Sequence, residues 1–119
     1  MATHNELGNK GEQLAVEFLQ KKGYKILERN WRFKKAEVDI ITQKNGVLAI
    51  IEVKTRSNNY FGNPQDFVNS KKIQLLVEAI NEYVTSKDLD VEVRFDIIAI
   101  LKKNTEFNIE HLKDAFLHF

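Results

Sequence analysis

Residues 36–54 read AEVDIITQKNGVLAIIEVK, and this stretch predicts an antiparallel hairpin. Asn45-Gly46 is a strong two-residue turn signal, because a type I′ turn needs positive φ at both central positions and these residue types tolerate it best. With the turn placed there, Lys44 faces Val47, and the residue numbers of every cross-strand pair sum to 91.

This register sets two acids side by side. Asp39 lies opposite Glu52, and Glu37 lies opposite Lys54. Opposed side chains share one face of a sheet with Cβ atoms about 4.5–5.5 Å apart, a separation at which like charges repel. Two carboxylates at ~4 Å repel by about 4 kcal/mol at an effective dielectric constant of about 20, so they need a compensating cation or a shared proton.

A hard divalent cation is the simplest compensation for this pair. Mg²⁺ takes oxygen ligands and commonly binds one or two carboxylates, while waters and a substrate phosphate complete its coordination. Lys54 follows Glu52 by two residues on the same strand, so its side chain points to the same face. The pattern therefore indicates a site where a metal ion, a phosphate and an ammonium group meet.

A plainer interpretation of the same residues stays open. Glu37, Asp39, Glu52 and Lys54 would form the solvated face of an edge hairpin, with Glu37 and Lys54 as a surface ion pair worth less than ~1 kcal/mol. Against it stands the sequence VLAII at residues 47–51, which is apolar on both faces and typical of a covered central strand. Charges at the margin of such a strand are costly without partners.

Length and composition indicate one domain over residues 1–119, large enough to bury a single core. Charged residues make up 29% and apolar residues 43% of the chain, as in ordinary globular proteins. No apolar run approaches the ~20 residues that span a bilayer, and the polar start MATHNE lacks a signal peptide's apolar region, so we expect a cytoplasmic protein with no membrane partner. The absence of cysteine and the scattered His4, His111 and His118 argue against zinc chemistry and histidine-based catalysis.

Residues 21–35 form a basic segment with a local charge excess of +6. Its cations are Lys21, Lys22, Lys25, Arg29, Arg32, Lys34 and Lys35, and its acid is Glu28. One interpretation is a surface that neutralises phosphates, with Trp31 and Phe33 as stacking platforms for bases. The other is a solvated strand and loop whose aromatic side chains belong to the core.

The chain predicts a helix, three strands, a second helix and one or two further strands. These elements are residues 8–22, 24–33, the two hairpin strands, 70–86, 91–101 and 107–109. Gly23 is placed to end the first helix, and Ser70 is placed to cap the second. Residues 57–69, with Gly62 and Pro64, predict a loop that covers another part of the molecule or moves.

Glu12 lies at the border of the first helix's apolar stripe, one residue after Gly11. Its carboxylate either turns toward the sheet or interacts with the helix macrodipole, which favours acids in the first turns. The sequence spacing leaves both interpretations open.

An acid in a first helix, then an Asp, then Glu-X-Lys on consecutive strands resembles the PD-(D/E)XK nuclease superfamily. More closely, the chain is similar to the bacterial YraN-like family over almost its whole length. The shared motifs are GNKGE at 8–12, GY at 23–24, RNWR at 29–32, EVDII at 37–41, EVKTR at 52–56, FG at 61–62, RFD at 94–96 and AF at 115–116. The chain departs from the family at Ala36, where Gly usually precedes Glu-X-Asp. The resemblance implies an α/β fold with a restriction-endonuclease-like αβββαβ core, in which helices flank a mixed central sheet.

The resemblance also implies a metal-dependent endonuclease that hydrolyses DNA phosphodiester bonds, on branched or structured DNA in the case of related Holliday-junction resolvases. Asp39, Glu52 and the backbone carbonyl of Val53 would bind Mg²⁺ or Mn²⁺. Lys54 would orient or activate the attacking water and stabilise charge in the transition state, and Glu12 would be an outer metal or water ligand. The metal would lower the pKa of water and offset phosphate charge.

Further cations are expected to contact nucleic-acid phosphates, although each is also an ordinary surface residue type. They are Arg29, Arg32, Lys34, Arg56 and Lys71 or its neighbour Lys72. A homodimer would suit an enzyme that makes paired incisions. Two other function classes stay open: a catalytically inactive nuclease-like module that binds nucleic acid, and an interaction or assembly protein whose acid cluster is vestigial.

Overall fold

The computed structural model describes residues 4–57 and 69–116. The elements are α1 (His4–Lys21), β1 (Lys25–Phe33), β2 (Ala36–Lys44), β3 (Val47–Arg56), α2 (Ser70–Ser86), β4 (Glu92–Lys103) and β5 (Glu106–Leu112). This order confirms the expected helix, three strands and second helix. Of the one or two further strands expected, the structure has two, and the last is longer than residues 107–109. Most of the expected loop, including Gly62 and Pro64, lies outside the described residues. No helix in the described ranges is long and apolar enough to cross a bilayer.

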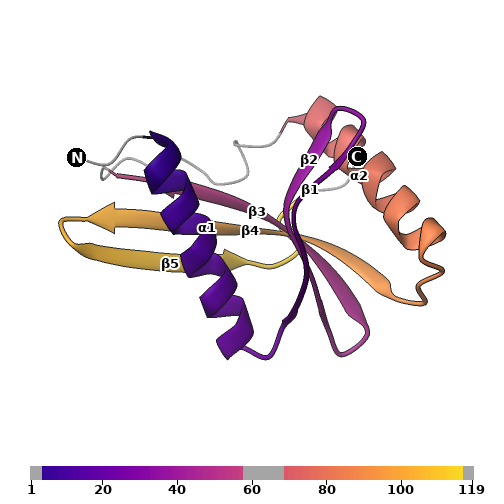
Figure 1. Cartoon of the computed structure of the whole chain (residues 1–119), viewed down its shortest axis with the longest axis horizontal. Coiled ribbons are helices and arrows are strands. Elements are labelled where there is room, and N and C mark those ends of the chain that lie inside the picture. Colours follow the sequence, from indigo (N-terminus) through magenta and orange to yellow (C-terminus); the bar gives the residue numbers. More distant parts are fainter. Residues whose placement is uncertain (1–3, 58–68, 117–119) are drawn as a thin grey trace.

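The five strands form one mixed sheet in the order β1-β2-β3-β4-β5 (Figure 1). β3 pairs with β4 in parallel, and the other neighbouring strands are antiparallel. The β2–β3 hairpin runs from the pair Lys44–Val47 to the pair Ile40–Ile51, so the predicted register is confirmed over these pairs. Its turn residues Asn45 and Gly46 have φ of 52° and 79°, as a type I′ turn requires. β3 is therefore central, and the interpretation as a solvated edge hairpin is wrong.

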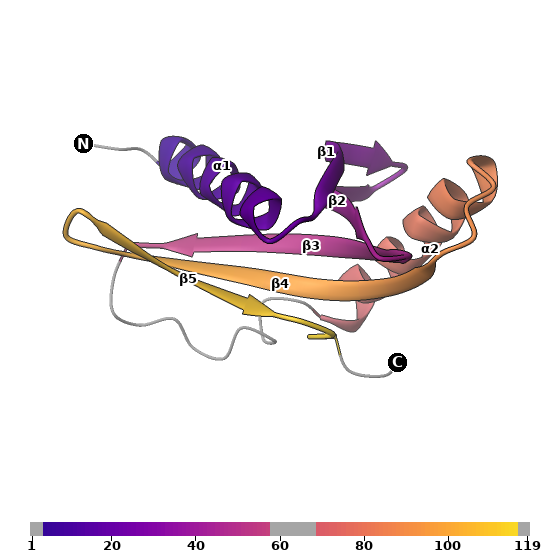
Figure 2. The same cartoon turned by 90° about the horizontal axis from the view of Figure 1, so that it is seen from below.

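Two apolar clusters cover β3 from opposite faces, which gives three layers. Ala49, Ile51 and Val53 belong to the cluster that includes α1 residues such as Leu19. Leu48 and Ile50 belong to the cluster that includes Leu76, Ile80 and Tyr83 of α2. Because successive strand residues point to opposite faces, the apolar run of β3 supplies both clusters. Figure 2 shows α1 on one side of β3, β4 and β5, with the β1–β2 hairpin rising out of their plane.

The helix ends follow local sequence chemistry. Gly23 has a φ of 91°, and its N–H donates to the Gln20 carbonyl at 3.0 Å, which confirms the glycine at the end of α1. At α2 the expectation of Ser70 as the cap is wrong. Asn69 caps the helix instead, because its Oδ1 accepts a hydrogen bond of 2.9 Å from the Lys72 N–H, and Ser70 becomes the first helical residue.

Candidate functional site

β2 and β3 separate at the position of the two predicted acids. Their ladder ends at the pair Ile40–Ile51, one pair before Asp39 and Glu52, while β2 continues along β1 and β3 continues along β4. At this fork, the Val53 N–H donates a hydrogen bond of 2.8 Å to Asp39 Oδ2. The Asp39 carboxylate thus takes the place of a strand partner and lies beside the Glu52–Val53 peptide. The fork brings the two acids together.

Glu52 is buried and lies between two ammonium groups. Its side chain is 7% exposed, and its Oε1 is 2.7 Å from Lys72 Nζ and 3.5 Å from Lys54 Nζ. Lys54 comes from the same strand, so the prediction that it shares a face with Glu52 is confirmed. Lys72 comes from the first turn of α2. Charges from two elements therefore compensate this carboxylate.

The environment of Asp39 strongly favours its protonated form. Burial, and after it the charge of the neighbouring Glu52, raise the pKa of Asp39 from 3.8 to about 7. The hydrogen bond from Val53 and the charge of Lys72 act in the opposite direction. Without a metal ion, Asp39 therefore favours its protonated form up to near-neutral pH, as expected where two carboxylates share one site.

Glu12 reaches the same site because α1 passes very close to β3. Gly11 is buried, and a Cβ built there would lie 3.0 Å from Thr55 Cβ. The next residue is Glu12, and burial raises its pKa, with a smaller increase from the charges of Glu37 and Glu52. A hydrogen bond from Asn30 and the charge of Arg29 lower the pKa in part. Glu12 also lines a hollow together with Asp39 and Glu52 of the sheet, which favours the interpretation that its carboxylate turns toward the sheet.

The close approach at Gly11 gives a testable prediction. Gly11→Ala forces α1 away from Thr55 and is expected to lower the free energy of unfolding by about 1–3 kcal/mol, the usual cost of overpacking. Gly8→Ala is the matched control in the same helix, because a Cβ at Gly8 meets nothing within 4 Å. It should be neutral or stabilise by roughly 0.5–1 kcal/mol. Urea unfolding measures both, and equal effects of the two substitutions would contradict this account.

Two surface hollows meet at Asp39 and Glu52. One, of about 300 Å³, is also lined by Leu7, Gly8, Glu12, Val53, Lys54, Thr55 and Arg56. The other, of about 340 Å³, is also lined by Lys35, Ala36, Glu37, Lys72, Leu75 and Leu76. A ligand that enters from either side therefore meets the two carboxylates, with cations on both flanks.

The donor set suits one kind of metal coordination. Within residues 4–57 and 69–116, no group of three or more His, Cys, Asp or Glu side chains is arranged to hold a metal ion. Mg²⁺, however, is usually bound through one or two carboxylates, with waters and a ligand phosphate filling the other positions. Asp39 and Glu52 fit that mode, since the open hollows leave room for water and ligand.

Of the cations predicted to contact phosphates, Arg56 lines one of the two hollows and Lys72 the other, and the rest line neither: Arg29, Arg32, Lys34 and Lys71. Arg29 donates to Gln13 Oε1 at 3.1 Å, and Lys34 pairs with Glu78 at 3.0 Å. Arg56 lines the hollow beside Glu12, and its side chain donates to the Thr55 carbonyl at 2.9 Å. Lys71 is exposed on α2, next to the residue that reaches Glu52.

The expected pairing of Glu37 with Lys54 is wrong. Glu37 forms an ion pair of 2.8 Å with Arg32 on β1. The reason is the fork: beyond Ile40, β2 follows β1 and leaves β3, so the hairpin register does not extend to Glu37.

The aromatic residues of the basic segment favour the core interpretation. Trp31 packs against the α2 cluster and meets the Tyr83 ring edge-on, with centroids 5.2 Å apart. Phe33 stacks on Trp31 at 6.3 Å, and Lys34 Nζ lies 5.3 Å from the Phe33 ring centroid. The rings of Trp31 and Phe33 thus already have contact partners within the protein, without a stacked nucleic-acid base.

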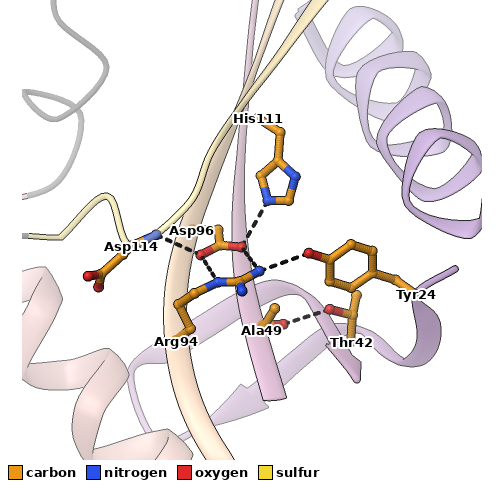
Figure 3. Close-up of polar contacts among 7 residues, drawn as sticks. All are labelled: Tyr24, Thr42, Ala49, Arg94, Asp96, His111 and Asp114. Atoms are coloured by element: carbon orange, nitrogen blue, oxygen red, sulfur yellow. Dashed lines mark hydrogen bonds and ion pairs between the residues drawn. The ribbon is translucent and has the colours of Figure 1, made fainter. Parts of the chain in front are cut away.

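The sequence reasoning missed a buried polar cluster around Asp96, shown in Figure 3. Asp96 is fully buried and accepts hydrogen bonds from Arg94 at 2.8 and 2.9 Å and from the Asp114 N–H at 3.0 Å. His111 Nε2 lies 2.8 Å from the same carboxylate, and Arg94 also donates to the Tyr24 hydroxyl at 2.9 Å. Arg94 and Asp96 lie two residues apart on β4 and share a face. This spacing of opposite charges was the sequence signal that could have predicted the cluster. The cluster ties β4, β5, the segment after β5 and Tyr24, the residue that precedes β1, together.

Comparisons with known proteins place this architecture in a family. The chain matches the model of the uncharacterised protein family UPF0102 over residues 11–100. A UPF0102 protein of Flavobacterium psychrophilum is 67% identical over 119 residues, covering 100% of both chains. A UPF0102 protein of Bacteroides thetaiotaomicron is 47% identical over 116 residues, covering 98% of this chain and 96% of that protein. The chain therefore belongs to the UPF0102 family, in agreement with its YraN-like motifs.

Proposed function

We propose that this protein is a metal-dependent phosphodiesterase of the PD-(D/E)XK type that hydrolyses DNA, including branched or structured forms. The observation that carries the proposal is the fork between β2 and β3, where half-buried Asp39 and buried Glu52 meet beside Lys54. The raised pKa of Asp39 indicates that the pair lacks the positive charge that would keep both carboxylates ionised. Mg²⁺ or Mn²⁺ would supply that charge.

Each residue has a role that its position supports. Asp39 and Glu52 would hold the metal, with the Val53 carbonyl as a further ligand. When bound, the metal would act as a Lewis acid that lowers the pKa of water and offsets phosphate charge. Lys54 would orient the attacking water and stabilise charge on the phosphate, and Glu12 would hold a second water in the hollow it shares with the pair.

One observation favours a second candidate, a nuclease-like module that binds nucleic acid without cutting it. Glu52 already has two ammonium partners, at 2.7 and 3.5 Å, so half of the acid pair is compensated without a metal. In such a module, the cations around the hollows would contact phosphates and the acids would have a structural role.

Metal titration and cleavage assays separate these candidates. Calorimetry should show Mn²⁺ binding to the wild type that is lost in Asp39→Asn and Glu52→Gln. Lys54→Ala should keep metal binding but lower cleavage by about 100-fold or more, the scale of losing one preorganised charge at a phosphoryl centre. Lys103→Ala, at an exposed position of β4, is the control and should cleave like the wild type.

The substrates are duplex, single-stranded, flapped and four-way DNA. Binding of Mn²⁺ and DNA without cleavage of any substrate would establish the binding module. Absence of both metal and DNA binding would leave the acid cluster as part of an interaction protein and refute the nuclease proposal.

A further inference from the structure

Lys72 occupies an unfavourable position in its own helix. Asn69 caps α2 through the Lys72 N–H, so Lys71 and Lys72 lie in the first turn, which contains no acidic residue. Positive side chains at a helix N-terminus oppose the macrodipole and destabilise the helix. The local sequence thus disfavours Lys72 here, and a long-range contact must explain its position.

That contact is with Glu52, and it is shorter than the contact made by Lys54. Lys72 Nζ lies 2.7 Å from Glu52 Oε1, against 3.5 Å for Lys54 Nζ. Glu52 is nearly buried, whereas the Lys72 side chain is 35% exposed. Because an unpaired buried carboxylate is costly, Lys72 is the principal counter-cation of Glu52 in the metal-free protein. A divalent cation bound to this carboxylate would repel the ammonium group.

We propose that Lys72 is a positioning residue which a divalent metal displaces from Glu52 and which then binds a phosphate group of the ligand. This inference rests on the metal site of the proposed function. The displaced ammonium has a defined destination, because Lys72 and Lys35 both line the hollow of about 340 Å³ beside the acids. Glu37, the other acid of that hollow, already pairs with Arg32 at 2.8 Å. Metal occupancy thereby creates an anion site, and metal and DNA bind with positive coupling.

Calorimetric titration with Mn²⁺ tests the displacement directly. Lys72→Gln removes the competing cation and should raise the affinity for Mn²⁺ by about tenfold, the usual worth of a charge-assisted hydrogen bond. Lys72→Arg keeps the charge and should bind Mn²⁺ like the wild type. Lys71→Gln, one residue away at an exposed position, controls for general electrostatics and should change the affinity by less than about twofold.

Binding of a labelled duplex DNA, measured with and without Ca²⁺ to limit hydrolysis, tests the second half. Ca²⁺ should tighten DNA binding of the wild type and of Lys72→Arg, and the enhancement should fall by several-fold in Lys72→Gln. If the wild type binds Mn²⁺ but Lys72→Gln binds it no more tightly than Lys71→Gln, the displacement is refuted and the proposed function stands. If the wild type binds no Mn²⁺, the proposed function fails first and the inference with it.

Discussion

Asp96→Asn is expected to lower the free energy of unfolding at pH 7 by about 3–5 kcal/mol, a large part of the 5–15 kcal/mol typical of a small domain. Asp96 is fully buried and faces only donors: two from Arg94, one from His111 and the Asp114 N–H. An amide in its place loses the negative charge and turns an NH₂ group toward one of these donors. The Arg94 guanidinium, whose side chain is 23% exposed, is left without its counter-ion.

Asp114→Asn is the matched control for this substitution. Asp114 contributes its backbone N–H to the cluster while its side chain is exposed, and asparagine tolerates its φ of 52°. The control should therefore remain within about 0.5 kcal/mol of the wild type in urea unfolding. Similar losses in both variants would show that Asp96 is not the centre of the cluster.

The same substitution has a defined pH dependence. Burial alone would raise the pKa of Asp96, but the hydrogen bonds from His111, Arg94 and Asp114 outweigh it and hold that pKa below 3.8. A lowered pKa in the folded state contributes stability that is complete above about pH 5 and is lost as the pH falls through the folded pKa. The difference between wild type and Asp96→Asn should therefore shrink as the pH falls below about 4. A difference that is independent of pH would mean that the carboxylate charge is not what stabilises the cluster.

The fold was predictable because its signals are local. The type I′ turn at Asn45-Gly46 sets the register of β2 and β3, and the apolar run from Leu48 to Ile51 requires a strand covered on both faces. Gly23 ends α1 through its left-handed backbone, a property that only its residue type supplies so readily. The cap of α2 was not predictable from residue type alone, since Asn69 and Ser70 are both good N-cap residues and it is Asn69 that accepts the Lys72 N–H.

The site was predictable only as far as the hairpin register reaches. Asp39 and Glu52 line the same hollows but do not form the predicted cross-strand pair, because the β2–β3 ladder ends at Ile40–Ile51. The departure of β2 from β3 beyond Ile40 depends on sheet twist and on pairing with β1, which cross-strand arithmetic does not contain. Glu37 was therefore assigned the wrong partner. Lys72 is remote in sequence and reaches Glu52 only through the packing of α2. The Asp96 cluster likewise unites four segments that no single motif connects.

Asp39→Asn is expected to stabilise the metal-free protein at pH 8 and to change its stability little at about pH 3, below the pKa of the unfolded carboxyl. Burial and the charge of Glu52 raise the pKa of Asp39 from 3.8 to about 7. An acid whose pKa is raised by folding binds more protons in the folded state between these two values, so wild-type stability falls as the pH rises from about 4 to about 7 and is level above. At ~1.4 kcal/mol per pKa unit, the free energy of unfolding falls by up to about 4 kcal/mol. Asparagine is not ionised, so the Asp39→Asn variant does not suffer this loss of stability. Its amide oxygen still accepts the hydrogen bond from the Val53 N–H.

Metal binding should show the reciprocal dependence. A divalent cation must replace the proton of Asp39, so the affinity of the wild type for Mn²⁺ should rise by up to about tenfold per unit between pH 5 and pH 7 and then level off. Calorimetry in buffers of different ionisation enthalpy should detect the released proton at pH 6. Glu37→Gln is the control, because Glu37 lies on the same strand and lines the same hollow but is exposed and paired with Arg32. It should keep both the pH profile and the proton release. A wild type whose Mn²⁺ affinity is flat from pH 5 to pH 8 would show that the carboxylate at the fork is not a metal ligand.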